Sequence, residues 1–124
     1  MGDTVDLDSN LSVAQDRADK KSHFNCWGAT QFVLGQAEDL WWVGVGEMLA
    51  WLKNATKKIY GPRKKGDVLV ITRYGGMQLI HTAVYVGGGL YFHKRGGNHA
   101  ETTDLKEVMK TYPGDKHYVR LKES

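Results

Sequence analysis

The sequence predicts an α+β fold, because helical patterns fill its first half and strand patterns fill most of its second half. Of its 124 residues, 41% are hydrophobic and 25% are charged, which is the composition of an ordinary globular domain. A chain of this length can bury a core without disulfides or a structural metal. The single cysteine, Cys26, excludes an internal disulfide and a zinc site built from several cysteines.

The segment that follows Asn25 has the spacing of one helical face. Its small and apolar side chains recur at i, i+3, i+4 and i+7 from Cys26. Asn25 is a typical N-cap residue, and Gly35 is a typical residue just after a helix. These features predict a helix over 26–35 with Cys26 in its first position.

Three other helices are expected. A short helix near 10–18 would precede the one just described. A longer helix near 44–58 would carry Lys57 and Lys58 in its last turn, where the helix dipole favours positive charge. A capping-box spacing predicts a short helix over 104–111.

Four segments are rich in β-branched residues or alternate between polar and apolar residues, and glycine turns separate the first three. They are residues 67–72, 78–86, 90–94 and 117–122. We therefore expect helices first and then a mostly antiparallel sheet of four or more strands, with one helix before the last strand.

Charge is distributed unevenly along the chain. Residues 1–19 have a balance of −4, so the other 105 residues carry +7, which suits an anionic partner such as nucleic acid, a membrane surface or a bacterial cell wall. No apolar run is long enough for a transmembrane segment. The N-terminus lacks the pattern of a secretory signal. We expect a protein made without a signal peptide that is cytoplasmic, or is delivered to the periplasm or cell wall by phage lysis or a secretion apparatus.

Cys26 and a pair of histidines are the candidates for chemistry. A thiol at a helix N-terminus is expected to have a lowered pKa, although a lone cysteine can equally be a small core residue. With Gly87–Gly89 as a hairpin loop, His81 and His93 become diagonal neighbours on one sheet face, with Cα atoms roughly 7–8 Å apart. One imidazole could then act as a base for the thiol and the second could orient the first.

Two other interpretations of the histidines stay open. They could be half-exposed sheet residues, or His81, His93 and His99 could bind a metal. No companion carboxylate has helical or hairpin spacing to them, which argues against a metal site. Thiol catalysis would imply no metal and no organic cofactor.

Four segments together resemble the NlpC-type cell-wall peptidases, which belong to the papain-like cysteine peptidase superfamily. They are Asn25–Gly28, Gly66–Val70, His81–Gly89 and Tyr91–His93. In that family a cysteine begins a helix, Gly-Asp opens a strand, a histidine begins a later strand, and a polar residue, often histidine, follows. Cysteine and both histidines occur here in the family's chain order.

The resemblance implies a papain-like fold and a Cys-His-His triad. Cys26 would be the nucleophile, His81 the general base and His93 the residue that orients His81. The backbone N–H of Cys26 would help to bind the oxyanion. Further candidates for the oxyanion site or for substrate binding are His23, Trp27, Tyr85 and Lys94. Residues 1–22 would be a polar lead-in and residues 23–124 the catalytic domain.

The implied function is thiol hydrolysis of amide bonds in peptidoglycan stem peptides. Departures from the family pattern include Asn25 before the cysteine and Trp27 after it. They leave room for a thiol acyltransferase or a toxin-like member of the superfamily. A non-catalytic module that binds cell wall or nucleic acid is a further alternative, although no specific nucleic-acid motif is present. The sequence does not identify an immunity or delivery partner. The tryptophans of residues 41–51 could fill the core or stack on sugars.

Overall fold

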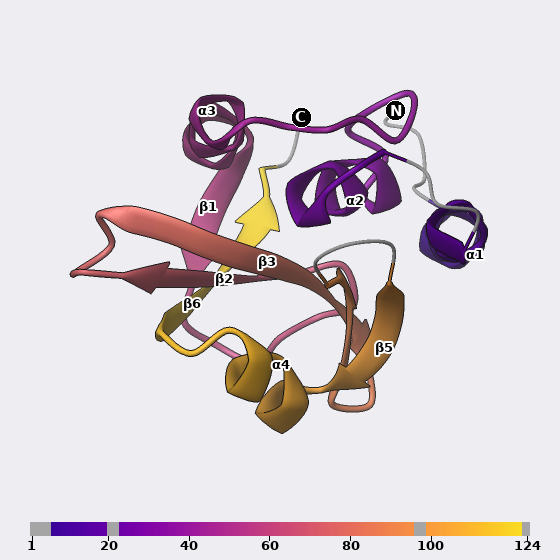
Figure 1. The fold of residues 1–124 in the computed structure, drawn as a ribbon. Helices are drawn as coiled ribbons and strands as arrows, with labels where there is room; N and C mark the ends of the chain where they lie inside the picture. The colour runs from indigo at the N-terminus through magenta and orange to yellow at the C-terminus, as the bar shows by residue number, and fades with distance from the viewer. Residues whose placement is uncertain (1–5, 20–22, 96–98, 123–124) are drawn as a thin grey trace.

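The computed structural model describes residues 6–19, 23–95 and 99–122, which form helices on both faces of one antiparallel sheet (Figure 1). The sheet has six strands in the order β1-β6-β2-β3-β4-β5. The strands are β1 (Thr56–Ile59), β2 (Val68–Arg73), β3 (Gln78–Gly87), β4 (Leu90–Lys94), β5 (Ala100–Asp104) and β6 (Asp115–Leu121). Helices α1 (Leu7–Asp19), α2 (Cys26–Val33) and α3 (Val45–Ala55) cover one face, and α4 (Leu105–Thr111) covers part of the other. The predicted α+β class is confirmed.

Helix α2 begins and ends at local signals that the sequence contains. The Asn25 side chain accepts a hydrogen bond from the Gly28 N–H at 2.9 Å, which satisfies one of the free donors of the first turn. Gly35 follows the helix with a φ of 72°, a conformation in which glycine carries no Cβ penalty. The predicted helix is confirmed, and it ends at Val33 in place of residue 35.

Helix α1 begins three residues earlier than expected because Asp6, and not a later residue, caps it. The Asp6 carboxylate accepts from the Ser9 N–H at 3.0 Å. Ala14 and Ala18 are buried in the core, where α1 packs on α2. The described part of the predicted lead-in 1–22 is therefore an integral helix of the fold, while residues 1–5 and 20–22 lie outside the described residues.

The prediction of a helix up to residue 58 is wrong. Helix α3 ends at Ala55, and Thr56–Ile59 forms the edge strand β1, paired antiparallel with β6. Lys57 and Lys58 therefore lie on a strand. Pairing with β6 gives this backbone hydrogen-bond partners, and Thr56 is a buried β-branched residue, so the tertiary context favours a strand.

The hairpin of β3 and β4 has the predicted register over its central pairs. Val84 lies opposite Phe92, and Tyr85 lies opposite Tyr91. Near the turn the register shifts, and Leu90 lies opposite Gly87. Side chains of these two strands alternate between two cores. One core packs against α1, α2 and α3, and the other packs against α4.

Candidate active site

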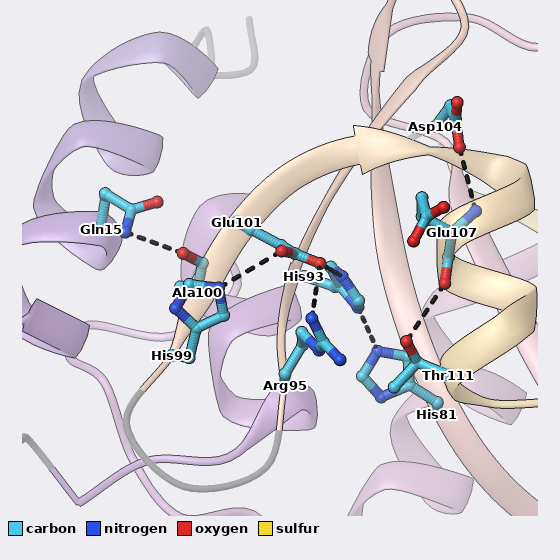
Figure 2. Close-up of polar contacts among 10 residues, drawn as sticks. All are labelled: Gln15, His81, His93, Arg95, His99, Ala100, Glu101, Asp104, Glu107 and Thr111. Atoms are coloured by element: carbon cyan, nitrogen blue, oxygen red, sulfur yellow. Dashed lines mark hydrogen bonds and ion pairs between the residues drawn. The ribbon is translucent and has the colours of Figure 1, made fainter.

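The structure brings His81 of β3 and His93 of β4 together, as the hairpin register predicts. His81 Nε2 lies 2.8 Å from His93 Nδ1, and both side chains are buried. The two rings meet edge to face, with centroids 5.0 Å apart and planes at 78°. Figure 2 shows this contact at one end of a chain of polar side chains that continues from His93 to Glu101 and on to Arg95 and His99. The pair is thus a buried, directly hydrogen-bonded unit, and not two half-exposed sheet histidines.

Tyr112 fixes the orientation of the His81 ring from the opposite layer. It follows α4 directly, and its ring stacks on the imidazole with centroids 3.7 Å apart and planes at 7°. Sequence reasoning missed this residue, because no periodicity connects the end of a late helix with a strand in the middle of the chain.

Glu101 extends the histidine pair toward the surface. It lies opposite His93 across the β4–β5 ladder, and its Oε2 is 3.0 Å from His93 Nε2. Its other oxygen lies 3.3 Å from His99 Nε2, and Arg95 Nη1 lies 3.7 Å from Oε2. Sequence reasoning also missed Glu101, because β5 is a short polar edge strand with no apolar alternation that would predict it.

Cys26 lies at the N-terminus of α2, against β3 at the residue next to His81. The backbone of Thr82, of Trp27 and of Cys26 itself acts to lower the pKa of its thiol. The Thr30 hydroxyl, one helical turn on, lies 2.8 Å from the Thr82 hydroxyl and joins α2 to β3. Among the described strand pairs, the β3–β4 pair that lies nearest to Thr82 is Val84 with Phe92, and no β3–β4 pair includes Thr82 itself. Thr82 therefore lies beyond the last β3–β4 pair, on the strand against which α2 packs.

Burial favours the neutral forms of both Cys26 and His81. It raises the pKa of the Cys26 thiol to about 11, because the lowering effects of backbone hydrogen bonds and of Lys94 are smaller than the cost of desolvating a thiolate. Burial, followed by the charge of His93, lowers the pKa of His81 to about 3. The expectation of a lowered thiol pKa is therefore wrong for the resting state, because burial outweighs the helix terminus.

We expect iodoacetamide to alkylate Cys26 slowly at neutral pH and faster as the pH rises. The thiolate is the reactive form, and a pKa near 11 leaves little of it at neutral pH. The rate should therefore grow about tenfold per pH unit through the alkaline range. Mass spectrometry of the alkylated Cys26 peptide gives the rate at each pH, and urea-unfolded protein is the control. A rate that is already maximal near neutral pH would instead indicate a resting thiolate–imidazolium pair.

The four further candidates from the sequence occupy different surroundings. Lys94 is buried, with its ammonium 5.0 Å from the centre of the Phe24 ring, and its charge acts on the Cys26 thiol. Trp27 is half-buried beside the core, and His23 is exposed. Tyr85 lies four residues beyond His81, about 13 Å along the strand, where its hydroxyl accepts from the Gly89 N–H. Trp27 and Lys94 are the two of these candidates that are linked to Cys26. Trp27 is the next residue of α2, and the charge of Lys94 acts on the Cys26 thiol.

Two exposed tryptophans lie in the loop that is attached to the start of α2. Trp41 and Trp42 are 54% and 70% exposed, so they are not core residues. The next residue, Val43, donates its N–H to the Asn25 side chain and accepts from it, at 3.1 and 2.7 Å. Asn25 thus caps α2 and also fixes this loop beside Cys26. Trp51, by contrast, packs half-buried against the core.

The described residues contain neither a metal-binding cluster nor a membrane-spanning helix. In residues 6–19, 23–95 and 99–122, no group of three or more His, Cys, Asp or Glu side chains is arranged to hold a metal ion. None of the helices in the described part of the chain combines the length and apolar character needed to span a bilayer.

Comparison with known proteins identifies the family. A model of the NlpC/P60 family matches residues 16–119. The chain belongs to the NlpC/P60 family. No curated protein matches it. Family membership supports a hydrolase of the cell-wall peptidase type.

Solved structures of NlpC/P60 proteins share the fold. NlpC1 from Trichomonas vaginalis superposes with a TM-score of 0.53 and 14% identity, over 92% of this chain and 45% of that one. An NLP/P60 family protein similar to a lipoprotein, from Staphylococcus aureus, superposes with a TM-score of 0.55 and 20% identity, over 94% of this chain and 43% of that one. The chain thus spans less than half the length of these proteins. The predicted papain-like fold is confirmed.

Proposed function

We propose that this NlpC/P60 domain is a cysteine peptidase that hydrolyses amide bonds in peptidoglycan stem peptides. Cys26 is the nucleophile, His81 is the general base, and His93 orients His81. The observation that carries the proposal is the state of the His81 ring. Its Nε2 is bonded to His93, while its Nδ1 is buried and has no hydrogen-bond partner among the described residues.

A buried nitrogen without a hydrogen-bond partner destabilises the fold, and a catalytic role would explain its presence. Leaving such a group unpaired costs about 1–3 kcal/mol, and exceptions of this kind call for an explanation. His81 adjoins Thr82 on β3, and the Thr82 backbone acts on the Cys26 thiol, while the His81 ring stacks on Tyr112 on the α4 side of the sheet. An unprotonated imidazole nitrogen can accept the thiol proton when the Cys26 sulfur comes within hydrogen-bonding distance of it, and the proposal requires this approach in the reacting complex.

The reaction follows from these neutral groups. As the Cys26 sulfur attacks the amide carbonyl carbon, its proton passes to His81 Nδ1 and the carbonyl oxygen becomes an oxyanion. The Cys26 N–H at the start of α2 donates to that oxyanion. Collapse of the intermediate breaks the C–N bond, and His81 returns the proton to the leaving amine. Water, deprotonated by His81, then attacks the thioester, which releases the carboxylic acid and restores the thiol.

Nearby groups stabilise the charge that forms during this reaction. Lys94 provides a buried positive charge that acts on the thiol, so it favours the partial thiolate of the attacking sulfur. Tyr112 stacks on the imidazole and keeps the ring plane fixed while the proton moves. Both groups would therefore assist the transfer of the proton from Cys26 to His81.

The direct test is digestion of purified peptidoglycan followed by mass spectrometry of the released fragments. We expect the protein to release peptide fragments with a new amine and a new carboxylate at one amide bond, and Cys26→Ala to release none. Adding an excess of a primary amine distinguishes a transferase, because the acyl group would then appear on the added amine. Identical fragments from both proteins would refute the proposed chemistry.

The loop tryptophans are proposed to bind the substrate beside Cys26. We expect Trp42→Ala to raise KM on a glycan-linked stem peptide about tenfold with kcat nearly unchanged, because lost stacking of about 1–1.5 kcal/mol affects binding and not the chemical step. Tyr60→Ala is the matched control, since Tyr60 is 91% exposed but follows β1, three strands from β3. Equal KM values for Trp42→Ala and the unmodified protein would remove this loop from the binding site.

A further inference from the structure

Glu101 is the one carboxylate in contact with the buried histidine pair among the described residues. Its side chain is 25% exposed, whereas the His93 side chain that it contacts is fully buried. Arg95 and His99, whose side chains are more exposed, contact the same carboxylate (Figure 2). Burial acts to raise the pKa of Glu101, but the hydrogen bonds from His93 and His99 and nearby positive charges outweigh it, so the net pKa is lowered. Glu101 is therefore ionised at neutral pH.

An ionised carboxylate can only accept hydrogen bonds, and this determines where the protons of the histidines lie. His93 must donate from Nε2 to Glu101. Burial lowers the pKa of His93, so this imidazole is neutral and its Nδ1 is an acceptor. His81 must then donate from Nε2 to His93 Nδ1. The remaining nitrogen, His81 Nδ1, is left with a lone pair.

We propose that Glu101 is a positioning residue that selects the catalytically competent tautomer of both histidines. The inference rests on the proposed function, since it concerns the base of that reaction. Without the carboxylate, the bond between the rings could also form with His93 donating from Nδ1 and His81 accepting at Nε2. His81 would then carry its proton on Nδ1, which could no longer take the proton of Cys26.

Three variants separate this role from a structural one. Glu101→Ala removes the acceptor, and Glu101→Gln keeps an amide oxygen that can accept from His93. Glu107→Gln is the matched control, because it neutralises an exposed carboxylate on α4. We expect Glu101→Ala to lower kcat about 10- to 100-fold with KM within about twofold, as for other partners of functional imidazoles. Glu101→Gln should recover most of the loss, and Glu107→Gln should match the unmodified protein.

Nitrogen NMR of protein labelled at its histidine side chains gives a readout that needs no substrate. In the unmodified protein we expect His81 to carry its proton on Nε2 with a bare Nδ1, and His93 to carry its proton on Nε2. Glu101→Ala should show the opposite or a mixed tautomer for both rings, while Glu101→Gln and Glu107→Gln should keep the original pattern. The spectra remain informative even if peptidoglycan digestion fails, so failure of the proposed function can be told apart from failure of this inference.

Two results would overturn the role of Glu101. One is an unchanged tautomer pattern in Glu101→Ala, whatever happens to its activity, because the loss would then be structural. The other is a kcat for Glu101→Ala within about twofold of the unmodified protein, well short of the loss typical of such partners. A changed tautomer pattern together with a selective loss of kcat would establish it.

Discussion

Cys26→Ala and His81→Ala each lower kcat/KM on a defined stem peptide by at least about 10⁴-fold, as expected when a nucleophile or its base is removed. Cys26 is the sole cysteine of the chain, so no other thiol can replace it. His81 has the only ring nitrogen of the hydrogen-bonded pair that is free to accept a proton. Steady-state assays with thermal melts measure the effect and check the folding of each variant.

His93 distinguishes the two histidine roles in the same assay. His93→Ala should be milder than His81→Ala, because an orienting residue can be replaced in part by water. His93→Asn and His93→Gln should retain more activity than His93→Ala, since an amide oxygen can still accept the His81 Nε2 proton. If His93→Ala were inactive and His81→Ala largely active, the two roles would be reversed.

Gly28→Ala lowers the free energy of unfolding by about 3 kcal/mol or more, the upper end of what overpacking costs. A Cβ at Gly28 would lie 1.8 Å from the Trp41 carbonyl oxygen. That oxygen belongs to the backbone of the loop that Asn25 fixes at Val43, so it cannot rotate away. Either α2 or the loop must move, and both carry proposed functional residues.

Gly46→Ala is the control for this substitution. Gly46 also lies in the first turn of a helix, but a Cβ there would meet no atom within 4 Å. The change should stabilise the protein by about 0.5–1 kcal/mol, because alanine loses less conformational entropy in a helix. Urea unfolding of both variants measures the difference. A Gly28→Ala variant as stable as Gly46→Ala would mean that the loop does not pack on α2 as the structure shows.

The features predicted correctly from the sequence depend on local signals. Asn25 and Gly35 delimit α2, and the glycines after residue 86 set the β3–β4 register that brings His81 to His93. The terminal strand and the α4 cap at Asp104 follow from equally local patterns. In each case a few neighbouring residues determine the backbone conformation.

The features that sequence reasoning missed depend on tertiary contacts. Strand β1 exists because β6 pairs with it, although its residues continue a helical pattern. Glu101 and Tyr112 reach the histidines only through the edge strand β5 and the end of α4. The ionisation of Cys26 depends on how deeply the thiol is buried, which the helix-terminus rule does not contain.

The most direct test of the central claim is capture of the covalent intermediate on Cys26. The protein is mixed with a stem peptide, quenched in acid and analysed by intact-protein and peptide mass spectrometry. We predict an adduct on the Cys26 peptide whose mass equals the acyl part of the substrate, which hydroxylamine removes and which Cys26→Ala never forms. Product release by Cys26→Ala at the rate of the unmodified protein, with no adduct on either, would contradict the account.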